Sequence, residues 1–372
     1  LILSSTVMLT TLSVDWINVI YEDYLFITVR SFIIQCISLL ALFLIVKESD
    51  DYYKYAFLQV INSALIALSN FVYTRKICKI KFTFKLNLKR HMRPIIILFS
   101  NSLAVSIYLN IDTILLGFMK SEYYVGLYSV SVKVYTILKQ VVASVYNVTI
   151  TRMTDYLSNK KDQQYKFLLN DVINNLIFVS VPIVSGIICT AKEIILVLAG
   201  KEYIVATKSL KILSCAIMFA VLGGALANCV NLPNKREGKN LKATILSALL
   251  NLGLNIVVIP FWGIEGTALT TLLAEIFVCV YLLMTMKDKW NYFIKHDIVI
   301  NFVKCSVATV PFFLIRYFLL YFVHVDGTLY FSVIAVLSVF SYVLVGYLLK
   351  NIYLTNIMHW ISKMIRKVSN DK

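Results

Sequence analysis

The sequence predicts an all-α polytopic membrane protein with about eleven transmembrane helices, and two observations carry this prediction. Hydrophobic residues make up 59% of the 372 residues and charged residues only 15%, whereas soluble domains average about 45–50% apolar and about 25% charged residues. The hydrophobic residues also gather in long stretches of about 20, the length that crosses a bilayer as a helix. This composition excludes a soluble enzyme.

Ten segments are long and apolar enough to span a bilayer, and residues 1–15 add an eleventh. In chain order the ten are 28–46, 53–73, 95–118, 125–149, 169–190, 208–230, 242–261, 265–285, 299–322 and 328–349. Two other stretches are not expected to span. Residues 191–207 are predicted to form an interfacial hairpin on the outer face, and residues 351–368 a basic amphipathic helix on the anionic inner leaflet.

The net charge of +16 is mainly a signal of topology. Basic residues concentrate in every second connection between spans, and the positive-inside rule assigns such connections to the cytoplasm. Eight lie in residues 74–93, four in 150–167, four in 231–242, three in 286–298 and five in the tail 350–372. The basic connections and the C-terminus are therefore predicted to be cytoplasmic, and no nucleic-acid partner is expected.

Eleven helices and a cytoplasmic C-terminus place residue 1 outside the cell. The sequence begins with Leu1, and no secretory signal with a charged start is present. We therefore expect an odd number of helices to precede this sequence in the natural protein. The alternative is a complete protein with an outer N-terminus.

Ionisable residues inside the predicted spans carry most of the functional information, because each costs about 2.5–3.5 kcal/mol at mid-bilayer unless it is paired or faces water. In the hairpin that turns near residue 122, antiparallel helices set Asp112 and Lys133 at equal depth. This pair is expected to lock the hairpin or to line a polar cavity. Lys139 lies opposite Ser106, which cannot neutralise it, so Lys139 is the better candidate for contact with an anion.

A second predicted hairpin turns at Gly263 and places Asn251 opposite Glu275 and Asn255 opposite Thr271. Asn251 and Asn255 are one turn apart on one helix face. Their amides are expected to hydrogen-bond across to Glu275 and Thr271, as polar side chains join helices in lipid. A structural role is favoured here over substrate contact.

Asn101 and Arg30 complete the candidate residues of a substrate cavity. Asn101 shares a predicted helix face with Tyr108 and Asp112, and such a polar stripe faces protein or a cavity rather than lipid. Arg30 and Arg316 lie near helix ends and can snorkel to the interface, so they rank lower. A cavity whose unpaired charges are mainly positive suits an anionic substrate.

No catalytic, metal or cofactor site is predicted. The sequence has no phosphate-binding loop, no Rossmann glycine fingerprint and no nucleophile elbow. Its seven cysteines and four histidines show no metal-binding spacing. A transporter is expected rather than an enzyme.

Four segments follow one another in an order and spacing that a known family shares. They are Asp112-Thr-Ile-Leu-Leu-Gly117 with Val125-Gly-Leu-Tyr-Ser-Val-Ser-Val-Lys133, Gly200-Lys-Glu-Tyr203 with Leu210-Lys-Ile-Leu213, Asn251-Leu-Gly-Leu-Asn255 with Ile259-Pro260, and Gly263-Ile-Glu-Gly-Thr-Ala-Leu-Thr-Thr-Leu-Leu-Ala-Glu275. Together they resemble the C-terminal lobe of the Wzx-type polysaccharide flippases of the multidrug/oligosaccharidyl-lipid/polysaccharide exporter superfamily. The segment from Asp15-Trp16 to Arg30 resembles the linker between helices 4 and 5 of that family.

The resemblance implies a fold of two six-helix lobes around a central cavity plus two added helices, fourteen in all, with the first three missing here. It implies the following division of the chain: 1–73 as the remaining half of the N-terminal lobe (helices 4–6), 74–93 as a basic cytoplasmic linker, 94–285 as the C-terminal lobe (helices 7–12), 286–350 as the additional helix pair (13–14), and 351–372 as a cytoplasmic amphipathic tail.

The resemblance also implies a function. Such a flippase translocates an undecaprenyl-diphosphate-linked oligosaccharide repeat unit across the bacterial cytoplasmic membrane, for O-antigen or capsule biosynthesis, by alternating access. A cationic cavity fits the diphosphate. A proton or Na⁺ gradient could drive transport, with Asp112 or Glu275 as the titrating group. The implied partners are membrane lipids and the polymerase and glycosyltransferases of the same pathway.

Two alternatives stay open at this point. A multidrug or cation exporter of the same superfamily would need an anionic or aromatic cavity. A membrane glycosyltransferase or polymerase of the same pathway is an enzyme, and a polymerase normally has a large outer loop. The longest predicted outer segment is residues 191–207, so this alternative has less support.

Overall fold

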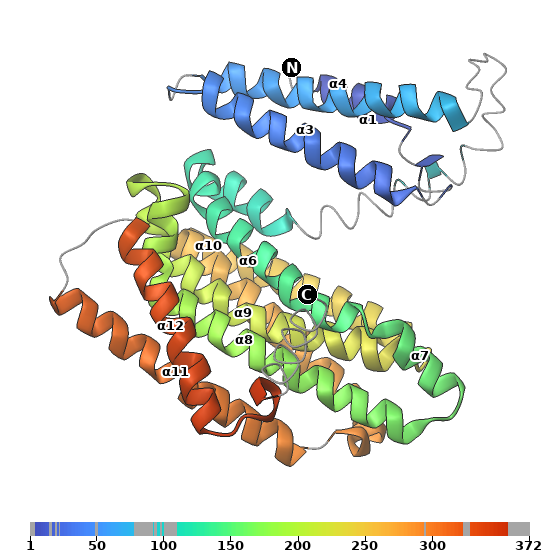
Figure 1. The fold of residues 1–372 in the computed structure, drawn as a ribbon, viewed down its shortest axis with the longest axis vertical. Helices are drawn as coiled ribbons and strands as arrows, with labels where there is room; N and C mark the ends of the chain where they lie inside the picture. The colour runs from blue at the N-terminus through green and yellow to red at the C-terminus, as the bar shows by residue number, and fades with distance from the viewer. Residues whose placement is uncertain are drawn as a thin grey trace, which may run out of the picture. The chain divides into compact units, whose positions relative to one another are not determined.

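The computed structural model describes residues 4–14, 17–18, 21, 23–48, 51–77, 92, 95–96, 99, 110–293, 295–322 and 328–355. All regular secondary structure in these residues is helical, which confirms the predicted all-α class (Figure 1). The chain divides into two compact units, Leu1–Ile96 and Ile97–Lys372. Their assignment to the two lobes of an exporter stays a prediction.

The first unit contains the described helices α1 (Ser5–Leu12), α3 (Tyr24–Ile45) and α4 (Tyr52–Ile77). α3 and α4 pack against each other, and α1 packs against α4. α1 has only 8 residues, fewer than a bilayer crossing requires. The described part of residues 1–15 therefore does not form the eleventh span.

The connection between α3 and α4 is held by Asp51. Its carboxylate binds Lys54 Nζ at 2.7 Å and accepts the backbone N–H groups of Lys47 and Glu48 at 3.0 and 3.2 Å. These bonds, with Lys54 the largest contributor, lower the pKa of Asp51 to about 2. Asp51 therefore stays ionised, and keeps its turn, at any physiological pH.

Arg30 does not snorkel as predicted, because it is buried between α3 and α4 with only 8% of its surface exposed. Its Nη1 donates to Asn70 Oδ1, which also accepts from Asn18 Nδ2 at 3.2 Å. The guanidinium lies 5.7 Å from the centroid of the Phe26 ring, a cation–π distance. A long polar side chain thus joins the two spanning helices of this unit.

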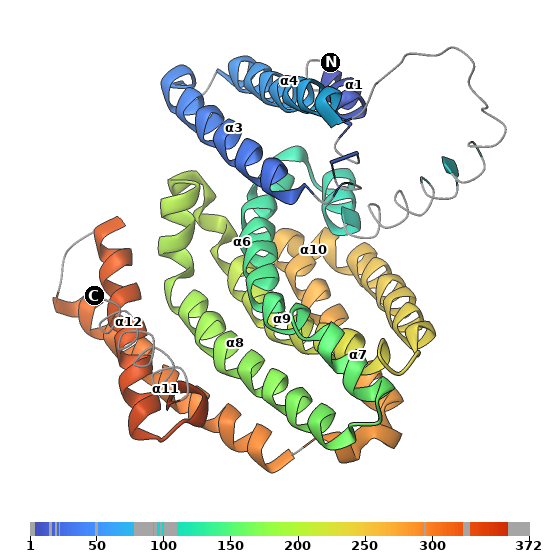
Figure 2. The same cartoon turned by 45° about the vertical axis from the view of Figure 1, so that its right-hand side comes forward.

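The second unit is a bundle of long helices in which α6, α8, α9 and α10 lie side by side, with α11 and α12 packed on α8 (Figures 1 and 2). A helix at Asn110–Met119 comes first. The later elements are α6 (Glu122–Asn147), α7 (Ile150–Ser158), α8 (Asp162–Leu198), the 3₁₀ helix η1 (Lys201–Ala206), α9 (Thr207–Ala225), the π-helix η2 (Leu226–Asn231), α10 (Glu237–Thr285), the 3₁₀ helix η3 (Lys287–Tyr292), α11 (Lys295–Phe322) and α12 (Thr328–Leu348).

The predicted interfacial hairpin at 191–207 is wrong in its first half. α8 kinks at Thr190 and then continues to Leu198, and only then does the chain turn at Gly200, which has a φ of 92°. The charge of Glu193 argued against a helix in the membrane. In the fold, Glu193 is buried and its carboxylate is paired with Arg316 of α11 at 3.1 Å. Arg316 is therefore paired with α8 and does not snorkel to the interface.

The predicted hairpin with its turn at Gly263 is confirmed within α10. Gly263 breaks the helix with φ of 50° and ψ of −127°, and the halves 237–262 and 264–285 pack against each other. A Cβ added at Gly266 would lie 2.7 Å from Val258 Cγ1, so the two halves approach closely here.

Seven described helices are long and apolar enough to cross a membrane. With the halves of α10 counted separately, they coincide with all the predicted spans except 1–15, 95–118 and 125–149. The segment 95–118 is described only in part, and so are the basic linker and the amphipathic tail. The span 125–149 corresponds to α6, whose 26 residues are long enough but less apolar than those of the seven.

We expect Gly263→Ala to destabilise the protein by about 1–3 kcal/mol, because L side chains strongly disfavour a φ of 50° with a ψ of −127°. Gly253→Ala is the matched control. Gly253 lies in the same helix, and a Cβ there meets nothing within 4 Å, so this change should be neutral or should stabilise by up to about 1 kcal/mol. Thermal unfolding of both variants in detergent tests the difference, and equal midpoints would contradict it.

Candidate functional site

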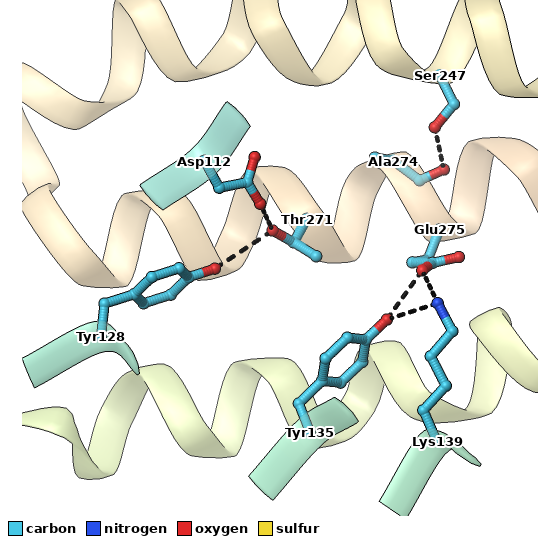
Figure 3. A network of polar contacts seen from close by, with 8 residues as sticks. All are labelled: Asp112, Tyr128, Tyr135, Lys139, Ser247, Thr271, Ala274 and Glu275. Atoms are coloured by element: carbon cyan, nitrogen blue, oxygen red, sulfur yellow. Dashed lines mark hydrogen bonds and ion pairs between the residues drawn. The ribbon is translucent and has the colours of Figure 1, made fainter. Parts of the chain in front are cut away.

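Polar side chains from three helical segments meet inside the second unit (Figure 3). The segments are the helix Asn110–Met119, α6 and α10. They bring two carboxylates, those of Asp112 and Glu275, between the packed helices of this unit.

Asp112 is held by neutral donors from both halves of α10. Its Oδ2 accepts the Thr271 hydroxyl at 2.6 Å, and its Oδ1 accepts Asn255 Nδ2 at 2.9 Å. The Asn255 amide also donates to Asn251 Oδ1 at 3.0 Å and accepts the Thr270 hydroxyl at 2.6 Å. Asn255 is fully buried, and these bonds use both of its amide hydrogens.

Glu275 is held instead by α6. Its Oε1 accepts Lys139 Nζ at 2.7 Å and the Tyr135 hydroxyl at 2.8 Å. Lys139 Nζ also lies 3.2 Å from the Tyr135 oxygen. The Lys139 and Glu275 side chains keep 37% and 20% of their surface exposed, so the pair lies at the edge of the buried core.

The two clusters are stacked along the second half of α10. Thr271 and Glu275 are four residues apart, so they project from the same face about one turn apart. Tyr128 of α6 reaches the Asp112 cluster, with its hydroxyl 3.4 Å from Thr271 Oγ1. The Ser247 hydroxyl, which donates to the carbonyl of Ala274 at 3.2 Å, joins the two halves of α10 near Glu275 (Figure 3).

The two carboxylates differ in charge compensation. Glu275 is neutralised by Lys139, whereas Asp112 has amide and hydroxyl donors but no basic side chain bonded to it among the described residues. A buried carboxylate without a counter-charge is stabilised when it takes up a proton or a small cation. The amide and hydroxyl oxygens around Asp112 are of the hard type that alkali and alkaline-earth ions prefer.

The predicted Asp112–Lys133 ion pair is wrong. Asp112 is bonded to α10, and Lys133 is exposed on another face of α6. Equal depth along two helices does not fix the direction in which each side chain points. Asp112 faces α10, which lies outside its own hairpin.

The expectation that Lys139 has no counter-charge is also wrong. Within its own hairpin the equal-depth position is Ser106, which lies outside the described residues. The partner is Glu275 of α10. Equal depth within one hairpin cannot reveal this ion pair, because Lys139 and Glu275 belong to two different hairpins.

Asn251 and Asn255 lie at a packed helix face and Asn255 hydrogen-bonds to the other half of α10, as predicted, but the predicted partners are wrong. Asn255 bonds Thr270, Asn251 and Asp112 rather than Thr271, and Glu275 is bonded to α6 rather than to Asn251.

Of the other candidates, Asn101 lies outside the described residues, and Arg30 belongs to the first unit. Their contact with substrate stays a prediction. Sequence reasoning missed Tyr135 and Thr270. The spacing of Tyr135 and Lys139, i and i+4 on α6, was the available signal, because it places a phenol beside the ammonium group.

Comparisons with known proteins agree with this architecture. A family model described as "Polysaccharide biosynthesis protein" matches residues 1–208. Over 167 residues the chain is 26% identical to the "Probable low-salt glycan biosynthesis flippase Agl15" of Haloferax volcanii, a match that covers 44% of this chain and 34% of that protein. The chain thus aligns with only about a third of that relative's length.

The fold resembles a solved structure described as "Lipid II flippase MurJ, inward closed conformation". The TM-score is 0.72 at 18% identity, and the match covers 95% of this chain and 72% of the other. At this identity the likeness concerns the fold alone, and it confirms the predicted polytopic helical membrane fold. Since the family model covers residues 1–208 of the 372, more than half, the chain belongs to the polysaccharide biosynthesis protein family.

Proposed function

We propose that this protein is a flippase that moves a lipid-linked oligosaccharide across a membrane by alternating access. The observation that carries the proposal is the polar network of Asp112, Lys139 and Glu275 inside membrane-spanning helices of a polysaccharide biosynthesis protein. Ionisable groups at such depth mark substrate or ion pathways in membrane proteins. Both the curated relative and the solved structure are named as flippases, which are transporters and not enzymes.

The finer form of the proposal concerns substrate and location. We propose an undecaprenyl-diphosphate-linked repeat unit of an O-antigen or capsule, carried across the bacterial cytoplasmic membrane. The alternation of basic connections supports a cytoplasmic C-terminus. The polymerase and glycosyltransferases that make and use such a repeat unit are the partners that this role requires.

A deletion experiment tests the proposal directly. Cells that lack the gene should accumulate lipid-linked repeat units accessible only from the cytoplasmic face, and reintroduction of the gene should restore surface polymer. Normal surface polymer and no accumulation in the deletion strain would contradict the flippase role.

Asp112 is a better candidate than Glu275 for the residue that couples transport to an ion gradient. Glu275 already has a counter-charge in Lys139, so a second cation gains little there. Asp112 has only neutral donors among the described residues, so a proton or Na⁺ adds the missing charge.

We expect Lys139→Ala to reduce surface polymer and also to destabilise the protein by about 3–5 kcal/mol, the usual cost of leaving one member of a buried pair alone. Because the pair is partly exposed, the lower end of this range applies. The double variant Lys139→Met/Glu275→Gln separates the two effects. It should recover the thermal midpoint, since no charge is left unpaired, but it should not recover export.

Two outcomes of this experiment would count against a role of the charges in transport. One is normal polymer in Lys139→Ala at normal protein level. The other is full recovery of export in the neutral double variant, which would make the pair purely structural.

For Asp112→Asn we expect loss of the response to an ion gradient without loss of stability, because the change removes an uncompensated charge and keeps the side-chain shape. Flipping of a lipid-linked oligosaccharide in proteoliposomes, with and without a Na⁺ or pH gradient, measures the response. Asp51→Asn, the same change in the α3–α4 connection, is the control and should leave the response intact. A gradient response retained in Asp112→Asn would exclude this residue as the coupling site.

A further inference from the structure

One exposed face of α6 carries only polar side chains. Its positions repeat at intervals of three and four residues, so they form one continuous stripe along the helix. The stripe, called here the α6 polar stripe, consists of Ser129, Lys133, Thr136, Gln140, Ser144 and Asn147, all of them exposed. From Ser129 to Asn147 it covers 19 residues, or about 27 Å along the helix axis, close to the roughly 30 Å of a bilayer core.

The remaining faces of α6 differ sharply from this stripe. The face that packs in the bundle is buried and includes Tyr128, Tyr135 and Tyr146. A second exposed face, adjacent to the stripe, is apolar and includes Ile137 and Val141, at 53% and 56% exposure. α6 therefore has two kinds of exposed surface, one suited to hydrocarbon and one not.

Among the described residues, four of the six stripe side chains have no hydrogen-bond partner. The hydroxyls of Ser129 and Ser144 bond to carbonyls of their own helix, at 2.7 and 2.6 Å. The side chains of Lys133, Gln140 and Asn147 make no hydrogen bond within the part of the chain that the structure describes, and neither does that of Thr136. Such groups cannot face lipid without a cost of about 1–3 kcal/mol each, so each must face water or other polar atoms.

We propose that the α6 polar stripe is the carbohydrate-contacting wall of the translocation path. This inference rests on the proposed flippase function and names the surface along which the glycan moves. Five of the six stripe residues carry neutral hydroxyl or amide groups, and Lys133 is the single cation. The neutral groups match the donors and acceptors of sugar hydroxyls.

The composition of the stripe suits movement as well as recognition. A neutral hydrogen bond contributes only about 0.5–1.5 kcal/mol, and the groups repeat about every turn. A glycan can thus exchange one contact for the next without a deep energy minimum. Lys133 is the one charged residue among the six of the stripe, and it is placed to hold an anionic group such as a phosphate while the sugars contact the neutral residues.

Water access is tested first, and this test does not depend on the substrate. In a background with all seven cysteines replaced by alanine, single cysteines are introduced by Thr136→Cys and Gln140→Cys on the stripe and by Ile137→Cys and Val141→Cys on the apolar face. A charged, membrane-impermeant thiol reagent is applied to right-side-out and inside-out vesicles. We expect labelling at 136 and 140 at least tenfold faster than at 137 and 141.

Carbohydrate contact is tested by Gln140→Leu and Thr136→Val, with export of surface polymer measured at equal protein level. We expect each to reduce export at least fivefold. Gln140→Asn, which keeps an amide, should restore part of the activity. Ile137→Leu is the matched control on the adjacent exposed face and should have no effect.

The outcomes separate the inference from the proposed function. Labelling at the stripe positions no faster than at the apolar ones overturns the inference, since the stripe then faces no water. Fast labelling with normal export in the Gln140→Leu/Thr136→Val double variant overturns the carbohydrate contact. If the gene deletion leaves lipid-linked glycan unaffected although the stripe is labelled, the flippase role fails, and with it the carbohydrate assignment, while a water-filled path stands.

Discussion

The ion pair between Lys139 and Glu275 organises the second unit. A charge inside a bilayer needs an internal partner or water, and here the partner comes from a helix 136 positions away in sequence. The pair, with Tyr135 bonded to the same carboxylate oxygen at 2.8 Å, fixes α6 against the second half of α10. The same requirement recurs where Glu193 meets Arg316 and where Arg30 meets Asn70. Each of these contacts joins a different pair of spanning helices.

Features set by local chemistry could be predicted from the sequence. Apolar stretches located the spans, and Gly263 located the turn within α10, because few other residues adopt its backbone conformation. Partners across hairpins could not be predicted. Glu275 binds α6 and not Asn251, and Glu193 looked like an interfacial charge until α11 supplied Arg316. Helix rotation and packing decide such pairs, and a single sequence records neither.

The two carboxylates of the network have opposite electrostatic situations, although Glu275 and Thr271, the residue that bonds Asp112, lie on neighbouring turns of one helix. Glu275 is compensated by Lys139, and the pair fixes α6 against α10. Asp112 is surrounded by neutral donors in the described part of the chain, so its free energy depends on what it binds. A buried group of that kind is a site where a gradient can act, since occupancy changes the local energy by more than a neutral contact would.

Rigid helices connect this site to the surface of α6. Thr271 bonds Asp112 and lies one turn from Glu275 on the second half of α10, so a shift of Thr271 on cation binding also shifts Glu275. Glu275 is bonded to Lys139 and Tyr135 on α6, and Lys139 lies beside the face of that helix that carries the polar stripe. A displacement of α10 relative to Asp112 must therefore rotate or strain α6, because packed helices move as units rather than deform continuously. Under the two proposals above, ion occupancy at Asp112 would be coupled to the orientation of the α6 polar stripe through these three bonded contacts.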